Sequence, residues 1–446
     1  MVRRVFAGTG AWYQSVRGNV RKVPIVGAPY FAEFSLSLLL GWAHFFALRR
    51  LSNGNLLATF ALMSDDSFDY VVEALALASF IETGHLTEWP VLRHPGLVVI
   101  LTFDLLLASG TGALWFFVSG LVTGLLSFGF FLAARSVSLP IFFPVTALAI
   151  IFFSPTAHFR MWLLADHMGT SLLALSALSF SLFFLKNAEV LGPASSRILF
   201  NLGAFFGVAG GLFQTYSLLP LLVASVILVI QRSATLIYAV IWVSGYLATQ
   251  LAWNASIPHN TRPANFSLIE PSLAMWPFYA ITWSFLLPGL AALWLGASRG
   301  KLGWTQVVYA WGTIGGFMAL LFFYQWPDMR LSMVLVSAAA AIGLVSIAPV
   351  FHTNSSTAKA AGLSALVLAT VMGLFIRPSS YWAPSSFAFD PSASVSLWSI
   401  GVEPVDRWGI PATCGELVPW CAEMVIPDGV SPYVSEILSY LATLVS

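Results

Sequence analysis

Long apolar runs recur along most of the chain and leave few folds open to it. Eleven runs are 14 to 23 residues long, against the roughly 20 residues that a helix needs to cross a bilayer. They are residues 28–48, 112–134, 139–154, 168–185, 198–213, 217–230, 235–253, 273–295, 304–324, 331–350 and 360–376. These lengths favour helices over the short alternating strands of a membrane barrel. The sequence therefore predicts an all-α polytopic membrane protein with about 11 transmembrane helices.

The scarcity of charge supports this class and excludes another. Only 9% of the residues are charged, whereas a soluble domain has about 25%. The net charge is +1, and no basic patch of the kind that binds nucleic acid is present. We expect membrane lipids, and no nucleic acid, among the partners of this chain.

The basic residues that flank the first run predict its orientation. The arm 1–27 carries Arg3, Arg4, Arg17, Arg21 and Lys22, whereas only Arg49 and Arg50 directly follow the run. Positively charged flanks remain in the cytoplasm. We therefore expect a cytoplasmic N-terminal arm, a membrane domain over residues 28–376, and an extracytoplasmic loop over residues 51–96. The expected location is a membrane of the bacterial inner (plasma) membrane type.

This first outer loop is a polar island in an apolar chain. Between Leu51 and Leu92 it holds six of the 19 acidic residues and no Lys or Arg; the six are Asp65, Asp66, Asp69, Glu73, Glu82 and Glu88. Asp66, Asp69 and Glu73 recur at helical spacing and share one face. We predict an amphipathic juxtamembrane helix that begins at Asp65, with Gly84 and Pro90 separating it from a second short piece.

The run at 96–109 leaves two topologies open. It has about 14 residues, fewer than a crossing needs, and contains Asp104. If it does not cross, Asp166 lies on the same side as the acidic loop; if it crosses, Asp166 lies in the cytoplasm. We prefer the first topology.

The last part of the chain differs in composition. Residues 377–446 hold seven acids and, after Arg377, one base. We expect a small C-terminal extracytoplasmic region with little core. Cys414 and Cys421 could close a disulfide there if that side is oxidising.

Four short elements then occur in an order that resembles a known family. They are DDSFDY at 65–70, HPGL at 94–97, Ser-Pro at 154–155 followed by LADH at 164–167, and PDMRL at 327–331. Together they resemble the GT-C glycosyltransferases, membrane enzymes that use polyprenyl-phosphate or polyprenyl-diphosphate sugars and include protein mannosyltransferases and the lipid A aminoarabinose transferase. Gly96 stands where the family has a second Pro. The resemblance covers roughly residues 28 to 350.

The resemblance implies roles for the charged residues. An acceptor hydroxyl must lose a proton as it attacks the anomeric carbon, and a carboxylate can take it. The family gives that role to the first loop acid, here Asp65, with Asp66 as the alternative. The leaving lipid phosphate needs fixed cations, for which Arg330 and Arg93 are the candidates. Asp166 would orient the acceptor or the sugar, or help to hold a metal.

Other residues near these elements are candidate substrate or metal contacts. They are His94, His167, Asp69 and Arg262. Two histidines with several acids could bind a divalent cation, Mg or Mn, and because some family members use a metal and others do not, metal dependence stays open. Each acid also has a structural explanation, since Asp65, Asp66 and Asp166 all stand where a helix is capped.

The resemblance predicts an inverting glycosyltransferase acting outside the cytoplasm. Its donor would be a polyprenyl-phosphate-linked sugar, and its acceptor a glycan, a glycolipid or a protein. The competing function is a transporter or flippase of lipid-linked sugars, which would also need a polar cavity. A transporter is expected to carry charges near the membrane midplane, whereas this chain gathers them at one rim.

Overall fold

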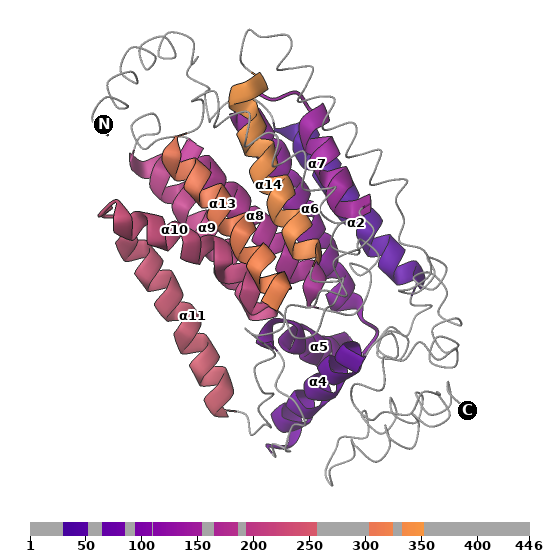
Figure 1. The fold of residues 1–446 in the computed structure, drawn as a ribbon. Helices are drawn as coiled ribbons and strands as arrows, with labels where there is room; N and C mark the ends of the chain where they lie inside the picture. Colours follow the sequence, from indigo (N-terminus) through magenta and orange to yellow (C-terminus); the bar gives the residue numbers. More distant parts are fainter. Residues whose placement is uncertain are drawn as a thin grey trace, which may run out of the picture.

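The computed structural model describes residues 30–51, 65–84, 94–108, 110–153, 165–185, 193–256, 303–323 and 332–351. Within these ranges all regular structure is helical, which confirms the predicted helical class (Figure 1). Among the described residues, four helices, at residues 113–136, 166–185, 195–213 and 236–255, are long and apolar enough to cross a membrane. The figure of about 11 remains a prediction, because the runs 273–295 and 360–376 lie outside the described residues, as do the arm 1–27 and the region 377–446.

The helices follow the apolar runs closely. Those that extend along the bundle are α2 (Phe31–Leu51), α6 (Ala113–Ser136), α7 (Phe142–Phe153), α8 (Asp166–Leu185), α9 (Pro193–Phe213), α10 (Leu219–Ile230), α11 (Leu236–Ser256), α13 (Trp304–Phe323) and α14 (Ser332–Phe351). The remaining helices are α4 (Asp65–Thr83), α5 (Pro95–Ala108) and the short 3-10 helix η3 (Thr215–Leu218). The helix predicted to begin at Asp65 is present as α4; it ends at Thr83 and is followed by Gly84, whose φ of 75° suits a residue without a Cβ.

α8 forms the centre of the bundle. It packs against α6, α9, α13 and α14, and 89% of its 18-residue apolar stretch is buried. Aromatic rings fill the space around its second half, where the Phe180 ring lies 5.3 Å from Phe200 of α9 and 6.1 Å from Tyr309 of α13. The neighbouring helices are thus arranged around α8.

One end of the bundle is marked by an ion pair between the start of α2 and the end of α6. The Arg135 guanidinium donates to the Glu33 carboxylate at 2.7 Å and lies 4.6 Å from the centre of the Tyr30 ring. The two helices are therefore antiparallel. They also lie very close together, since a Cβ on Gly41 would come within 2.6 Å of the Gly120 carbonyl oxygen. We call this the Arg135 end.

The opposite end, which we call the Asp166 end, holds the start of α8 and the ends of several other helices. The α9–α10 corner covers the start of α8, because Ser217 of η3 donates to the Gly169 carbonyl at 3.0 Å. α13 ends here, since its Gly316 packs against Leu219 at the start of α10. α14 ends at the Arg135 end, where the Phe351 ring lies 5.2 Å from the Phe143 ring at the start of α7. The start of α14 therefore belongs to the Asp166 end.

α5 begins and ends at the Asp166 end. Its start packs against the end of α9, where a Cβ on Gly96 would lie 2.9 Å from the Phe213 ring. Near its end, Asp104 accepts hydrogen bonds from the backbone amides of Gly112 and Leu114 at the start of α6. This geometry agrees with the topology in which residues 96–109 do not cross. Figure 1 shows α4 and α5 together across the lower end of the bundle.

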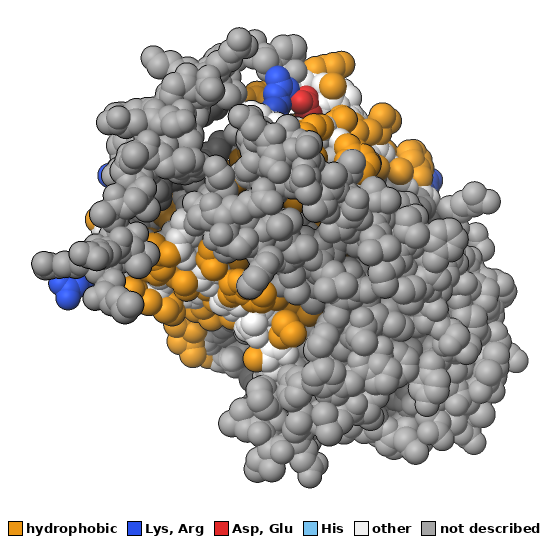
Figure 2. All heavy atoms as spheres, turned by 45° about the horizontal axis from the view of Figure 1, so that its top comes forward, with side chains coloured by type: hydrophobic (Ala, Val, Ile, Leu, Met, Phe, Trp, Pro, Cys, Tyr) orange, Lys and Arg blue, Asp and Glu red, His pale blue; other side chains and the backbone are white. Residues whose placement is uncertain are grey.

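The described outer surface is apolar. Large side chains such as Phe31, Leu107 and Leu251 are more than two-thirds exposed. In α11, only 11% of an 18-residue apolar stretch is buried. Figure 2 shows hydrophobic side chains over most of the coloured surface, with charged groups in a few places. Such a surface is stable against lipid rather than water.

The topology predicts which positions can be labelled from each side of a membrane. With Cys414 and Cys421 replaced by serine, single cysteines are introduced at exposed positions: Thr83 and Thr111 at the Asp166 end, and Ser138 and Ala234 at the Arg135 end. We expect an impermeant maleimide to label the first two from one side and the last two from the other. Labelling of Thr83→Cys and Thr111→Cys from opposite sides would contradict the placement of α5.

Candidate functional site

Asp166 is the first residue of α8 and is only 5% exposed. Its carboxylate accepts a hydrogen bond from the Tyr216 hydroxyl of η3 at 3.0 Å, and its carbonyl accepts one from Thr170 at 2.6 Å. A carboxylate at the first turn of a helix is favoured by the helix dipole. The sequence predicted that this helix begins at Met168. In the structure it begins two residues earlier, so Asp166 and His167 belong to α8.

His167 lies fully buried beside Asp166. Its Nε2 is 3.1 Å from the Thr123 hydroxyl and 3.4 Å from the Ser119 carbonyl oxygen, both on α6. Its ring stacks on that of His44 from α2, with centroids 4.6 Å apart and planes inclined by 25°.

Three helices and one corner therefore meet around a polar cluster, which we call the His–Asp cluster: His44, Ser119, Thr123, Asp166, His167 and Tyr216. They surround the start of α8: Tyr216 lies on η3 after α9, His44 and Ser119 lie about two turns inside α2 and α6 on the side of the Asp166 end, and Thr123 lies near the middle of α6. Buried polar groups are stable only where hydrogen bonds compensate their lost hydration. The Asp166 carboxylate is bonded on the η3 side of the helix start, and the His167 imidazole on the side of α6 and α2.

α4 brings the loop acids to the same end of the bundle. Asp65, Asp66 and Asp69 all fall within its first five residues, where the helix dipole favours negative charge. The structure describes their backbone and not their side chains. α4 packs on α5, and α5 in turn contacts α6 and α9, so the acid-rich start of α4 belongs to a helix pair fixed to the Asp166 end.

The buried face of α4 is not the purely apolar one that the sequence suggested. Tyr70, Glu73 and Ala74 are each no more than 2% exposed, and Thr102 of α5 donates to the Ala74 carbonyl at 3.3 Å. Glu73, expected on the polar face with Asp66 and Asp69, thus lies inside. The reason is that α4 has a protein neighbour, α5, whereas the amphipathic pattern was interpreted against a membrane surface alone.

Asp104 joins the two helices that frame this end. It is fully buried, and its two carboxylate oxygens lie 2.6 Å and 2.7 Å from the amides of Gly112 and Leu114. Burial raises the pKa of the Asp104 carboxyl, while the bonds from Leu114 and Gly112 lower it and offset part of that rise. Asp104 therefore caps α6 from a neighbouring helix and fixes the position of Ser119 and Thr123.

Of the remaining candidate residues, the structure describes His94 but not the three arginines. His94 is half-buried and directly precedes α5, next to the contact of Gly96 with the end of α9. Arg93, Arg262 and Arg330 lie outside the described residues. Arg330 precedes α14 by two positions, and the end of α13 and the start of α14 that flank its segment both belong to the Asp166 end.

Within the described parts of the chain, no group of three or more His, Cys, Asp or Glu side chains is arranged to hold a metal. The metal hypothesis involved His94 and His167 together with acids such as Asp69 and Asp166; the side chain of Asp69 is not described, and the hypothesis stays a hypothesis.

Sequence reasoning missed four residues of this end: His44, Glu73, Asp104 as a cap, and Tyr216. His44 and Tyr216 stand in apolar surroundings with no motif near them. Asp104 gave a signal, since an acid in an apolar helix is costly and needs partners. The partners themselves depend on how the helices rotate against one another, which hydropathy does not encode.

Comparison of the chain with family models, with curated proteins and with solved structures finds no match.

The Tyr216–Asp166 bond predicts a measurable coupling. Tyr216→Phe removes the hydroxyl that donates to the carboxylate, and we expect it to lower the free energy of unfolding by about 1–2 kcal/mol. Because Asp166→Asn weakens the same bond, the double variant should lose less than the sum of the single losses. Denaturant unfolding in detergent measures both effects. Tyr238→Phe, a half-buried tyrosine at the Arg135 end, is the control, and full additivity would contradict the coupling.

The Asp104 cap predicts a larger effect. Asp104→Ala leaves two amides at the start of α6 without their acceptor and should lower the free energy of unfolding by about 2–3 kcal/mol. Asp104→Asn, which keeps one acceptor oxygen, should lose about half as much. Thermal unfolding in detergent is the measurement, with the exposed neighbour Thr111→Ala as control. Equal stability of Asp104→Ala and the control would show that the cap contributes nothing.

Proposed function

We propose that this protein is an integral-membrane inverting glycosyltransferase that moves a sugar from a polyprenyl-phosphate or polyprenyl-diphosphate donor to an acceptor hydroxyl. The observation that supports it is a convergence at the Asp166 end. α4, which begins with the loop acids, packs on α5 at that end; α8 begins there with the buried Asp166, and the two helix ends that flank the segment with Arg330 belong there too. These are three of the four sequence elements on which the GT-C resemblance depends.

The reaction assigns one step to the acids of α4. The acceptor oxygen attacks the anomeric carbon of the sugar, and its proton passes to a carboxylate as the new C–O bond forms. Asp65 takes this proton, with Asp66 as the alternative. The dipole of α4 favours the carboxylate form of both, which is the form that a general base requires.

The lipid phosphate departs in the same displacement, from the face of the anomeric carbon opposite to the attacking oxygen. The bond between the anomeric carbon and the phosphate oxygen breaks, and the oxygen keeps the electron pair. Arg330 and Arg93 stabilise the negative charge that develops on this leaving group, because guanidinium groups bind phosphate oxygens bidentately. A donor whose lipid tail stays in the bilayer would approach the site from the apolar flank of the bundle.

The His–Asp cluster orients rather than reacts in this proposal. Asp166 is tied to Tyr216, and His167 to α6, so these groups have little freedom to move. Fixed polar groups at the base of a site position an acceptor or a sugar hydroxyl. Asp69, His94 and Arg262 remain candidate contacts of the substrates or of a divalent cation.

A transfer assay tests the proposal directly. Membranes that contain the protein are incubated with a panel of radiolabelled polyprenyl-phosphate sugars. We expect Asp65→Asn to lower transfer about 100- to 10,000-fold, as loss of a general base does, and Arg330→Ala to lower it about 100- to 1,000-fold. Matched controls are Glu82→Gln, an exposed acid on the same helix, and Arg232→Ala at the Arg135 end.

Each outcome of this assay separates the candidates. Activity that survives in Asp65→Asn and vanishes in Asp66→Asn would move the general base to Asp66. Equal loss in Glu82→Gln would mean that the charge of α4, and no particular acid, matters. If no donor is consumed while lipid-linked sugar still changes leaflet in vesicles, the flippase function replaces the enzyme.

A further inference from the structure

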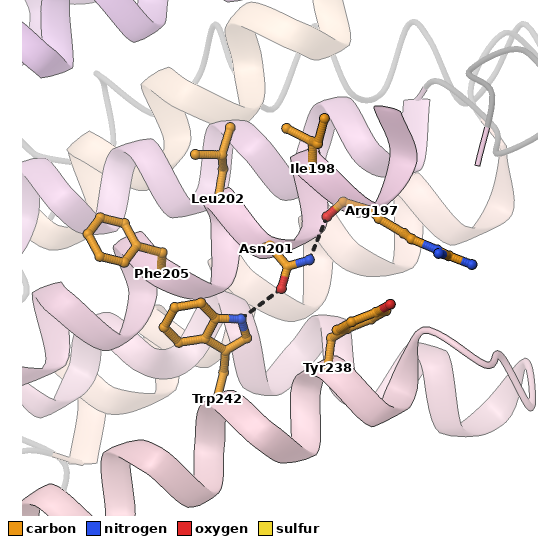
Figure 3. A pocket seen from close by; sticks show the side chains of 7 residues that line it. All are labelled: Arg197, Ile198, Asn201, Leu202, Phe205, Tyr238 and Trp242. Atoms are coloured by element: carbon orange, nitrogen blue, oxygen red, sulfur yellow. Dashed lines mark hydrogen bonds between the residues drawn. The ribbon is translucent and has the colours of Figure 1, made fainter. Parts of the chain in front are cut away.

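A shallow groove lies between α9 and α11 near the Arg135 end, far along the bundle from the His–Asp cluster. It has a volume of about 410 Å³ and is lined by Arg197, Ile198, Asn201, Leu202 and Phe205 of α9 and by residues of α11. The α11 wall consists of Tyr238 and Trp242 (Figure 3). The lining residues of α9 span about 12 Å along the helix axis, at 1.5 Å per residue.

A hydrogen-bonded link holds the two walls together. The Trp242 indole N–H donates to the Asn201 side-chain oxygen at 2.9 Å, and the Asn201 amide donates to the Arg197 carbonyl at 2.9 Å. The Trp242 ring also lies 6.0 Å from that of Phe205, edge to face. The groove is therefore fixed by contacts between its walls.

The two ends of the groove differ in chemistry. Figure 3 shows the Arg197 guanidinium and the Tyr238 hydroxyl extending toward the same end, while Leu202, Phe205 and Trp242 occupy the other. The apolar end is open, since Phe205 is 48% and Leu202 42% exposed. One end thus offers a cation and a hydroxyl, and the other offers exposed hydrocarbon.

The depth of this groove matches that of a lipid headgroup. Arg197 stands two residues after Ser195, where the apolar span of α9 begins, so its guanidinium lies at the level where a span meets water. Tyr and Trp are enriched at the same level. Basic pockets between membrane helices bind the headgroups of anionic lipids.

We propose that this groove binds one anionic phospholipid of the bilayer, with its phosphate at Arg197 and Tyr238 and an acyl chain along Leu202, Phe205 and Trp242. The charge of Arg197 complements the headgroup, and the apolar wall complements the chain. The proposal depends on the membrane character of the bundle and is independent of the glycosyltransferase proposal.

Native mass spectrometry of the purified chain tests this site. The protein in detergent is titrated with phosphatidylglycerol or with phosphatidylcholine of the same acyl chains. We expect the wild type to retain phosphatidylglycerol more strongly. Arg197→Gln should weaken phosphatidylglycerol binding about fivefold, the loss expected for one arginine near an anionic surface, and leave phosphatidylcholine unchanged.

Two further variants separate the groove from general surface charge. Arg232→Gln removes another exposed arginine at the Arg135 end that does not line the groove, and it should retain phosphatidylglycerol as the wild type does. Leu202→Trp fills the apolar end at a position exposed enough to tolerate it, and should weaken retention of both lipids. Equal losses in Arg197→Gln and Arg232→Gln, or equal retention of the two lipids by the wild type, would overturn the proposal.

Discussion

The burial of α8 is the constraint on which the rest of this structure depends. Within α8, 89% of an 18-residue apolar stretch is buried inside the protein. The polar groups there can reach neither water nor lipid headgroups, so neighbouring helices must form hydrogen bonds with them. Ser176 donates to the Gly203 carbonyl of α9 at 2.7 Å, and Ser217 donates to the Gly169 carbonyl. These bonds fix the rotation of α8 against α9 and against the α9–α10 corner, which apolar contact alone would leave loosely specified.

The same constraint gives the start of α8 its character. Asp166 and His167 lie at the one level of this helix where charge can be favourable, because the unpaired amides of a helix start attract an acid. Tyr216 holds the acid from one side, and α6 holds the imidazole from the other. α6 is itself held by Asp104, which comes from α5. The start of α8 is thus connected through α6 to α5, and α5 packs against α4.

Hydropathy predicted where helices run because each crossing must satisfy its own backbone. The run 304–324 became Trp304–Phe323, and the run 235–253 became Leu236–Ser256. Hydropathy did not predict which residues meet, because an apolar helix offers no single face for a pattern to mark. The stack of His44 on His167 and the burial of Glu73 follow from the rotation and pairing of helices. Asp65, Asp66 and Asp69 could be identified as candidate residues from the sequence because acidic residues are otherwise sparse in this chain.

The two ends of the bundle treat charge in opposite ways. At the Asp166 end, an acid and an imidazole point into the protein and are bound by side chains of three other elements. At the Arg135 end, Arg197 and Arg232 are exposed, and the Arg135–Glu33 pair lies at the rim between two helices. Inward polar groups cost hydration and are retained where they must meet a polar molecule or hold a fold together. Outward cations cost little, because they stay in water or at the level of the headgroups. The proposed enzyme requires the inward polar groups of the Asp166 end, and the proposed lipid site requires an outward cation at the Arg135 end.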